Sequence, residues 1–324
     1  MFGIVMQEAI NVIHHTMHKS LLDDLSLYLK LNGNQNKFCI YSDYCLDDVK
    51  KPNKVASFTI APMGTALPEA TEEITIALPK DIKKSKMISG KGVDLLVNKS
   101  FFHINFIIKD TSGILYSENK TSQKVILEAL DETINMISSW IDNQPEGAGK
   151  FKEQIKKFKQ WQCELKKKSI NINLTRNILL ISMLAAYIAF LLTKYAKAED
   201  IIWFSDRDKI VDSYNRIAYE IFDICHFGFC DQLGATEPYS NIGIPSPDIT
   251  SGALWFDHLI RIPDYLAGTL ASWDISNNEV ERIKHDEILK KVFAENDFCG
   301  VIDLAIGQDD CKCSHHKVFT TKVS

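Results

Sequence analysis

Three aspartates in this chain stand where a strand is expected to end or a helix to begin. Asp43 closes the segment KFCIYSD, Asp206 follows the apolar segment DIIWFS, and Asp264 lies in IRIPDYLAG. Carboxylates that are brought close together repel one another, and a hard divalent cation such as Mg²⁺ or Mn²⁺ relieves that repulsion. A cation held in this way can activate water and stabilise charge on a phosphoryl group. If the three aspartates meet in space, they could hold such a cation, with Asp208 as a possible fourth ligand.

Each of these residues also has a local structural explanation. Asp43 could make a turn, and the sequence Asp206-Arg207-Asp208 could cap the helix that follows it. Asp264 follows Pro263, and an acid in the first turn of a helix complements the macrodipole. The sequence therefore leaves open whether these aspartates form one site or serve separate elements.

Two further aspartates are weaker candidates for the same site. Asp110 ends another expected strand, although the following Thr-Ser-Gly favours a turn. Asp257 lies seven residues before Asp264 and would share its helix face only if one helix continues through Pro263.

The elements that must position these residues follow one another in a readable order. Apolar and strand-forming residues predict strands at 37–43, 55–62, 100–110 and 200–205, a possible antiparallel return at 111–116, and either an edge strand or a helix entrance at 249–256. Helical spacing predicts helices at 2–31, 121–142, 150–168, 174–196, 208–227, 263–274 and 280–293. This order predicts an α/β fold with a mixed five-stranded sheet flanked by helices.

We expect three regions along the chain. Residues 1–34 form an N-terminal helical segment, and residues 35–275 form the α/β domain with a helical insertion near 121–170. Residues 276–324 form a C-terminal helix and a tail rich in Cys and His. The stretch 64–98 is not clearly patterned and is interpreted as an insertion or a mobile connection.

The segments IYSDYCLDD, WFSDRD and IRIPDYLAGTLA resemble the prokaryotic family called domain of unknown function 3800. Asp43, Asp206 and Asp264 match its three aspartates, with Ala267-Gly268 in register, and the resemblance covers residues 37–62 and 175–274. It implies a ribonuclease H-like fold and a nuclease that uses Mg²⁺ or Mn²⁺.

The resemblance also implies a biological setting and has one important departure. Its members suggest a protein of toxin or phage-defence type that acts on RNA or DNA and has a possible protein partner. Tyr44 and Cys45, however, stand where the family has Glu and Ser. A degenerate ribonuclease H-like module that binds or scaffolds without cleaving is therefore the alternative.

Composition limits how such a protein could contact nucleic acid. The net charge is −5 and the pI is about 6.0, so any surface for nucleic acid must be local. The lysine-rich run 150–168, with Phe151, Phe158 and Trp161 interleaved, could follow a phosphate backbone. It could equally be the solvated face of a packed helix.

The N-terminus and the cysteines indicate the compartment. MFGIVMQEAINVIHH has neither a basic n-region nor a cleavage signature, so we expect a cytoplasmic protein whose eight cysteines are free thiols. The clusters CHFGFC (225–230) and CKCSHH (311–316) lack the paired Cys-x₂-Cys spacing of zinc sites, and His14 and His18 have only i, i+4 spacing.

One apolar run allows a different location. Residues 178–193 are almost wholly apolar, but these 16 residues fall short of the roughly 20 that a spanning helix needs. We expect a buried core helix here and no contact with a membrane, and a membrane span is the alternative.

Overall fold

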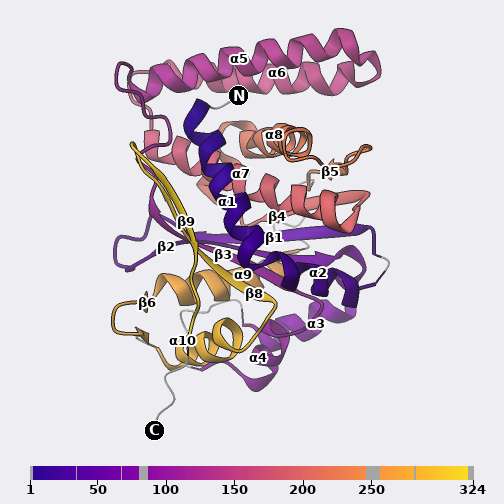
Figure 1. Ribbon diagram of the computed structural model, residues 1–324, viewed down its shortest axis with the longest axis vertical. Helices are drawn as coiled ribbons and strands as arrows, with labels where there is room; N and C mark the ends of the chain where they lie inside the picture. The colour runs from indigo at the N-terminus through magenta and orange to yellow at the C-terminus, as the bar shows by residue number, and fades with distance from the viewer. Residues whose placement is uncertain are drawn as a thin grey trace.

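Apolar, strand-forming segments assemble into a seven-stranded mixed sheet with helices on both faces (Figure 1). The structure is a computed structural model that describes residues 3–33, 35–66, 68–79, 87–245, 256–280 and 282–319. The strands of this sheet are β1 (Lys37–Cys45), β2 (Lys54–Pro62), β3 (Phe102–Asp110), β4 (Asp200–Ser205), β5 (Asn241–Gly243), β8 (Cys299–Ile306) and β9 (Cys311–His315). A separate two-stranded ribbon consists of β6 (Trp273–Asp274) and β7 (Glu279–Val280).

The order of strands across the sheet is β5-β4-β1-β2-β3-β8-β9. β1, β2 and β3 are antiparallel neighbours, whereas β4 runs parallel to β1 and β5 runs parallel to β4. On the other side β8 runs parallel to β3, and β9 returns antiparallel to β8. The carboxyl ends of β1, β3 and β4 therefore lie at one edge of the sheet.

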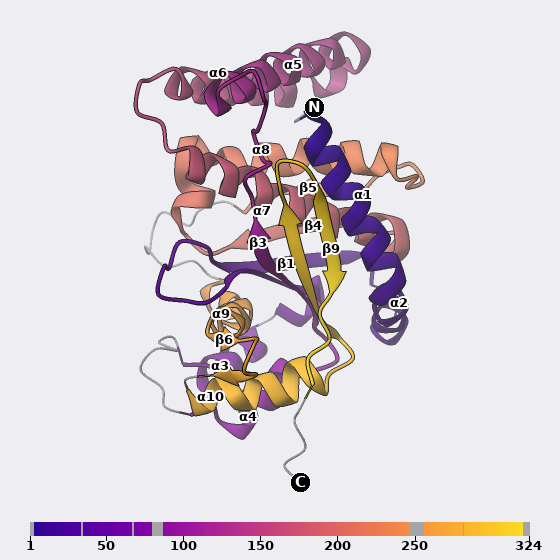
Figure 2. The same ribbon diagram turned by 60° about the vertical axis from the view of Figure 1, so that its left-hand side comes forward.

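A different set of helices covers each face of the sheet (Figure 2). One face carries α1 (Gly3–Ser20), α2 (Leu22–Leu31), α7 (Ile172–Leu191) with its π-helical end η3 (Leu192–Ala196), and α8 (Lys209–Gln232), with the hairpin of α5 (Ser122–Asn143) and α6 (Ala148–Leu165) stacked outside them. The other face carries α9 (Asp257–Ala271), α3 (Pro68–Ala77), α4 (Gly90–Leu96) and α10 (Ile283–Ile288), which continues as η4 (Leu289–Ala294). Short 3₁₀ turns lie at η1 (Met63–Ala66) and η2 (Pro145–Gly147).

The apolar segment that could have been a membrane span is α7. Among the described residues, Ile172–Ala196 is the one helix that is long and apolar enough to cross a membrane by length and composition. In its most apolar window, 89% of the residues are buried inside the protein, where they pack against the sheet and α8. Such burial removes the apolar side chains of α7 from water, as expected for a core helix.

The prediction of five strands is wrong, because the C-terminal region supplies two more. β8 and β9 come from the segment that was expected to be a tail, and they extend the sheet beyond β3. The segment 111–116 makes a turn instead of a return strand, in which Gly113 N donates to Ile306 O at 2.9 Å. A Cβ at Gly113 would lie 1.9 Å from Gly307 O, so this turn needs a glycine. Because no return strand follows β3 directly, its outer edge would be unpaired, and β8 pairs with that edge instead.

The last core helix also begins earlier than predicted. α9 starts at Asp257 and runs through Pro263, although a proline removes one hydrogen bond from the helix interior. Burial of most of its side chains against the sheet offsets this loss. Residues 249–255 of the predicted strand or helix entrance lie outside the described residues. The described part of 64–98 is largely helical, as α3 and α4.

Candidate functional site

Alternation along β1 separates the side chains at its carboxyl end. Ile40, Ser42 and Tyr44 face the layer of α7 and α8, whereas Tyr41 and Asp43 face α9, because successive side chains of a strand point to opposite sides. Asp43 therefore lies on the α9 face of the sheet, near the carboxyl end of β1 and two residues before its last residue, Cys45.

The register of β4 brings Asp206 to the same place. The last parallel pair of the two strands is Ser42 with Ser205, so the next position along β4 lies beside Asp43. The backbone N–H of Asp206 donates to Ser42 O at 3.3 Å, which continues the ladder by one step. Asp206 has an exposed side chain, and Asp43 is half-buried.

The third aspartate arrives from α9, which packs across β1 and β2. The carboxyl groups of Asp43 and Asp264 are hydrogen-bonded to each other. Burial, the neighbouring Asp264 and then the neighbouring Asp206 raise the pKa of Asp43 well above its ordinary value of 3.8. The structure thus brings together the three aspartates that the sequence placed on separate elements.

The raised pKa of Asp43 favours its neutral form when no cation is bound. Asp206 turns one oxygen, Oδ1, to the backbone N–H of Arg207 at 2.8 Å. In the described ranges no group of three or more His, Cys, Asp or Glu side chains is arranged to hold a metal ion. The carboxylate oxygens of the cluster are nevertheless the donors that Mg²⁺ or Mn²⁺ prefers.

Asp208 has the local role that the sequence offered as an alternative. Its Oδ1 accepts the N–H groups of Ile210 at 2.8 Å and Val211 at 3.1 Å, so it is the N-cap of α8. Burial, followed by the nearby charges of Asp206 and Asp212, raises its pKa to about 6. The capping interpretation is confirmed for this residue.

The two weaker carboxylates differ in their surroundings. Asp110 accepts the N–H and the hydroxyl of Ser112 at 2.8 and 2.9 Å, so it makes the predicted turn at the end of β3. Asp257 lies in the first turn of α9, about two turns before Asp264 on the same continuous helix.

Tyr44 belongs to a hydrogen-bond network on the α7–α8 face. Its hydroxyl contacts Ser42 Oγ at 2.5 Å and accepts from Ser205 Oγ at 3.0 Å, and Trp203 Nε1 donates to Ser42 Oγ at 2.8 Å. Position 44 faces away from α9, so a Glu there would begin on the side of the sheet opposite Asp43. Having Tyr44 in place of that Glu therefore does not remove a metal ligand from the Asp43 side of the sheet.

Two polar residues missed by the sequence analysis continue the row of Asp43 under α9. Register pairs Asp43 with Ser57 on β2, and Ser57 with Asn105 on β3. Both side chains are fully buried, and neither Ser57 Oγ nor Asn105 Oδ1 has a hydrogen-bond partner within the described part of the chain. Strand alternation could have revealed this row once the pairing of β1, β2 and β3 was known.

The side chains of the Cys and His clusters make contacts within the protein. All eight cysteines are free, as predicted. His226 Nε2 contacts Thr193 Oγ1 at 2.8 Å inside the protein, and His316 Nδ1 pairs with Asp303 at 2.7 Å. His14 and His18 contact each other, and each bonds a tyrosine, Tyr187 and Tyr195 respectively.

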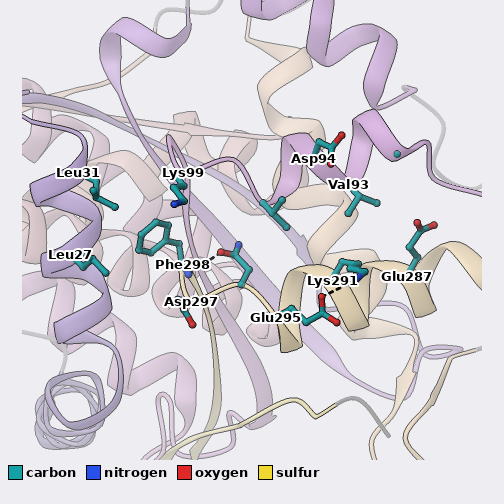
Figure 3. A pocket seen from close by; sticks show the side chains of 13 residues that line it. Leu27, Leu31, Val93, Asp94, Lys99, Glu287, Lys291, Glu295, Asp297 and Phe298 are labelled. Carbon is teal, nitrogen blue, oxygen red and sulfur yellow. Dashed lines mark hydrogen bonds and ion pairs between the residues drawn. The ribbon is translucent and has the colours of Figure 1, made fainter. Parts of the chain in front are cut away.

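A pocket lies away from the carboxylates. The pocket has a volume of 670 Å³ and lies between α2, α4 and η4 (Figure 3). Its 13 lining residues include Leu27, Leu31, Asp94, Lys99, Glu295, Asp297 and Phe298. Lys99 and Phe298 precede β3 and β8, so this pocket is at the end of the sheet where β1 and β3 begin. It is not part of the aspartate site.

Comparison with known proteins supplies no relative for this chain. No family model, no curated protein and no solved structure matches it.

Proposed function

We propose that this protein is a metal-dependent nuclease that hydrolyses phosphodiester bonds with Asp43, Asp206 and Asp264. The observation that carries the proposal is the convergence of these residues from β1, β4 and α9 at one edge of the sheet. Carboxylates forced together in this way raise one another's pKa, and a bound divalent cation is the usual means of relieving the repulsion.

The strand order gives independent support to the ribonuclease H-like part of the proposal. Strands β3-β2-β1-β4-β5 comprise three antiparallel strands followed by two parallel ones, which is the arrangement of a ribonuclease H-like sheet. Asp43 and Asp206 lie at the ends of its two central neighbours, as the resemblance to the domain of unknown function 3800 family implies. β8 and β9 are then additions to the edge of that sheet.

The residues of the site would divide the work between them. Asp43 and Asp264 would hold Mg²⁺ or Mn²⁺ from the buried side, and the exposed Asp206 would hold it from the side that faces solvent and substrate. When bound, such an ion supplies an activated water and neutralises charge on the reacting phosphate. Asp208 would act by fixing the start of α8, and thereby the loop that carries Asp206.

Cleavage of labelled RNA and DNA in the presence of Mn²⁺ tests the proposal directly. We expect wild-type protein to cleave one of the two, EDTA to abolish cleavage, and Asp206→Asn to reduce it strongly. Asp110→Asn is the matched control, because Asp110 ends a strand at the same edge but makes only a turn. Equal cleavage by wild type and Asp206→Asn would remove the assignment.

The second candidate function is a ribonuclease H-like module that binds or scaffolds and does not cleave. Burial and the neighbouring Asp264 favour it, because they raise the pKa of Asp43 and so stabilise its neutral form, which is a weaker ligand for a cation. Calorimetry with Mn²⁺ separates the two candidates. The nuclease requires binding that Asp43→Asn abolishes, whereas the scaffold predicts no binding in either protein.

The setting of the protein is part of the same proposal. A cytoplasmic role in a prokaryotic toxin or phage-defence system, with a protein partner and without membrane attachment, rests on the family resemblance and the free cysteines. Fractionation without detergent, followed by a phage-challenge assay of cells with and without Asp206→Asn, tests both parts.

A further inference from the structure

Positive charge is concentrated on one helix of a chain that is acidic overall. Residues 150–168 contain eight lysines and two glutamates, whereas the whole chain has a net charge of −5. These lysines lie on α6 and the residues that follow it, in the helical hairpin stacked outside α7 and α8 (Figure 1).

The inner face of α6 accounts for some of these lysines. Phe158, Trp161 and Leu165 are buried there against the rest of the protein. Lys150 pairs with Asp223 at 2.6 Å, and Lys157 pairs with the buried Glu220. These two lysines therefore have a structural partner on α8.

The outer face of α6 carries a second set of lysines that packing does not explain. Lys152, Lys156 and Lys159 are exposed and line a shallow groove of 560 Å³. Lys156 lies 3.5 Å from Glu153 in an exposed pair, and no ion pair joins Lys152 or Lys159 to any residue in the described ranges. Exposed pairs of this kind contribute little to stability, so this row is not needed for folding.

The row leads toward the carboxylate edge of the sheet. Lys166, Lys167 and Lys168 follow α6, and α7 begins four positions after Lys168, at Ile172. Asn177, in the second turn of α7, donates to Asp47 Oδ1 at 3.3 Å, four residues after Asp43. In both views the connection from α6 to α7 lies on the same side of the molecule as the connection from β1 to β2 (Figures 1 and 2).

An interruption of the helical backbone of α8 contacts the end of α6 and lies near the same edge of the sheet. Tyr214, Asn215 and Arg216 have positive φ values of 52°, 57° and 60°, a backbone conformation that costs free energy for residues other than glycine. Tyr214 lies against Trp161, with ring centroids 5.9 Å apart, and it is only six positions after Asp208 in the sequence. The basic end of α6 is thereby held beside the first turns of α8.

We propose that the outer face of α6 binds the phosphate backbone of a nucleic acid that continues to the aspartate site, with Lys152, Lys156 and Lys159 as contacting residues. From Lys152 to Lys166 the basic row extends about 21 Å at a rise of about 1.5 Å per residue, which is long enough for several consecutive phosphates. A membrane surface fits less well, because the apolar face of α6 is buried inside the protein. This inference rests on the proposed nuclease function and names the surface that presents its substrate.

Binding in the absence of cleavage tests the proposal. Labelled RNA and DNA, single-stranded and duplex, are titrated in EDTA with the full-length Asp206→Asn protein over a series of salt concentrations. Adding Lys152→Gln, Lys156→Gln and Lys159→Gln together should weaken binding at least tenfold. It should also reduce the slope of log Kd against log salt by about 2 for single strands and somewhat more for duplexes. The control carries Lys290→Gln, Lys291→Gln and Lys312→Gln, which are exposed lysines outside α6, and should bind as the parent does.

Several results would overturn this surface. Unchanged affinity and salt slope in the α6 variant would do so, as would the absence of binding by the parent protein. Equally tight binding of polyglutamate that the α6 changes abolish would assign the surface to an acidic polypeptide instead. Wild-type cleavage with an unaffected α6 variant would remove the surface and leave the nuclease. Binding as expected in a protein that cleaves nothing would remove the nuclease and leave the surface.

Discussion

The two sides of the carboxyl end of β1 contrast sharply, although consecutive residues build them. On the α7–α8 side, Ser42, Tyr44, Trp203 and Ser205 form a connected hydrogen-bond network among buried and half-buried groups. On the α9 side, burial and the neighbouring Asp264 raise the pKa of Asp43, while Ser57 Oγ and Asn105 Oδ1 have no partner among the described residues.

This difference separates stabilising polar groups from groups that are available for binding. A buried polar network that is fully hydrogen-bonded rigidifies the structure, whereas buried polar atoms without partners cost free energy until something satisfies them. The α7–α8 side therefore supports the end of β1, and the α9 side is the one with capacity for a ligand.

The largest effect should come from removing the charge of the α9 side. We expect Asp43→Asn to reduce Mn²⁺-dependent cleavage on the order of 100-fold or more, because a carboxylate ligand is lost. Its unfolding free energy without metal should not fall, because a half-buried acid with acidic neighbours is replaced by an amide. Single-turnover cleavage and urea unfolding measure the two quantities. An unchanged cleavage rate would place the chemistry elsewhere.

The second effect concerns the network of the α7–α8 side. Ser42→Ala leaves both Trp203 Nε1 and the Tyr44 hydroxyl without the partner they share, so unfolding free energy should fall by about 2 to 3 kcal/mol. Cleavage at a temperature where the variant is folded should stay within a few-fold of wild type. A loss of cleavage as large as that of Asp43→Asn would show that the two sides are not separate.

A pH-dependent effect is expected at Asp208, which follows Asp206 and caps α8. Its folded pKa of about 6 exceeds its ordinary value of 3.8, so the folded state holds this proton more tightly than the unfolded state does. The resulting stability is present below about pH 4 and is lost as the pH rises to 6, by on the order of 2 kcal/mol. Asp208→Asn keeps the cap and should remove this part of the pH dependence, measured as the difference from wild type in urea unfolding between pH 4 and 7. A difference that grows in the opposite direction would contradict the assignment.

The smallest effect should come from Ser57→Ala. The hydroxyl of Ser57 has no partner in the described structure, so its removal should change unfolding free energy by less than about 0.5 kcal/mol in the metal-free protein. Its contrast with Ser42→Ala is the sharpest test of the comparison, since the same substitution is made on adjacent strands with opposite orientation. Equal losses in the two variants would show that Ser57 has a hydrogen-bond partner.

The sequence predicted the strands that end at Asp43 and Asp206 because both are apolar runs followed by an acidic residue. Their proximity depends on the parallel pairing of β1 with β4, across more than 150 residues, which local patterns do not encode. Asp208 shows the same limit in the other direction. It has the chemistry of a ligand, but only the geometry of α8 reveals that it caps a helix.

β8 was missed because its environment comes from a distant strand. CGVIDLAI is a short apolar run after a charged helix, and it was grouped with the Cys- and His-rich residues that follow it. Its pairing with β3 makes it a strand of the main sheet. Pro263 was placed at the start of a helix because proline is common there, whereas burial of α9 keeps the helix continuous through it.

The contact between α1 and β9 bears on how the protein is made. Thr16 Oγ1 donates to Cys313 O at 3.0 Å, and α1 packs against a strand that lies nearly 300 residues later. During synthesis α1 and β3 leave the ribosome long before β8 and β9. Until then the apolar side of α1 is exposed and the outer edge of β3 is unpaired. A nascent chain of this protein would therefore be a client for chaperones until its last strands emerge.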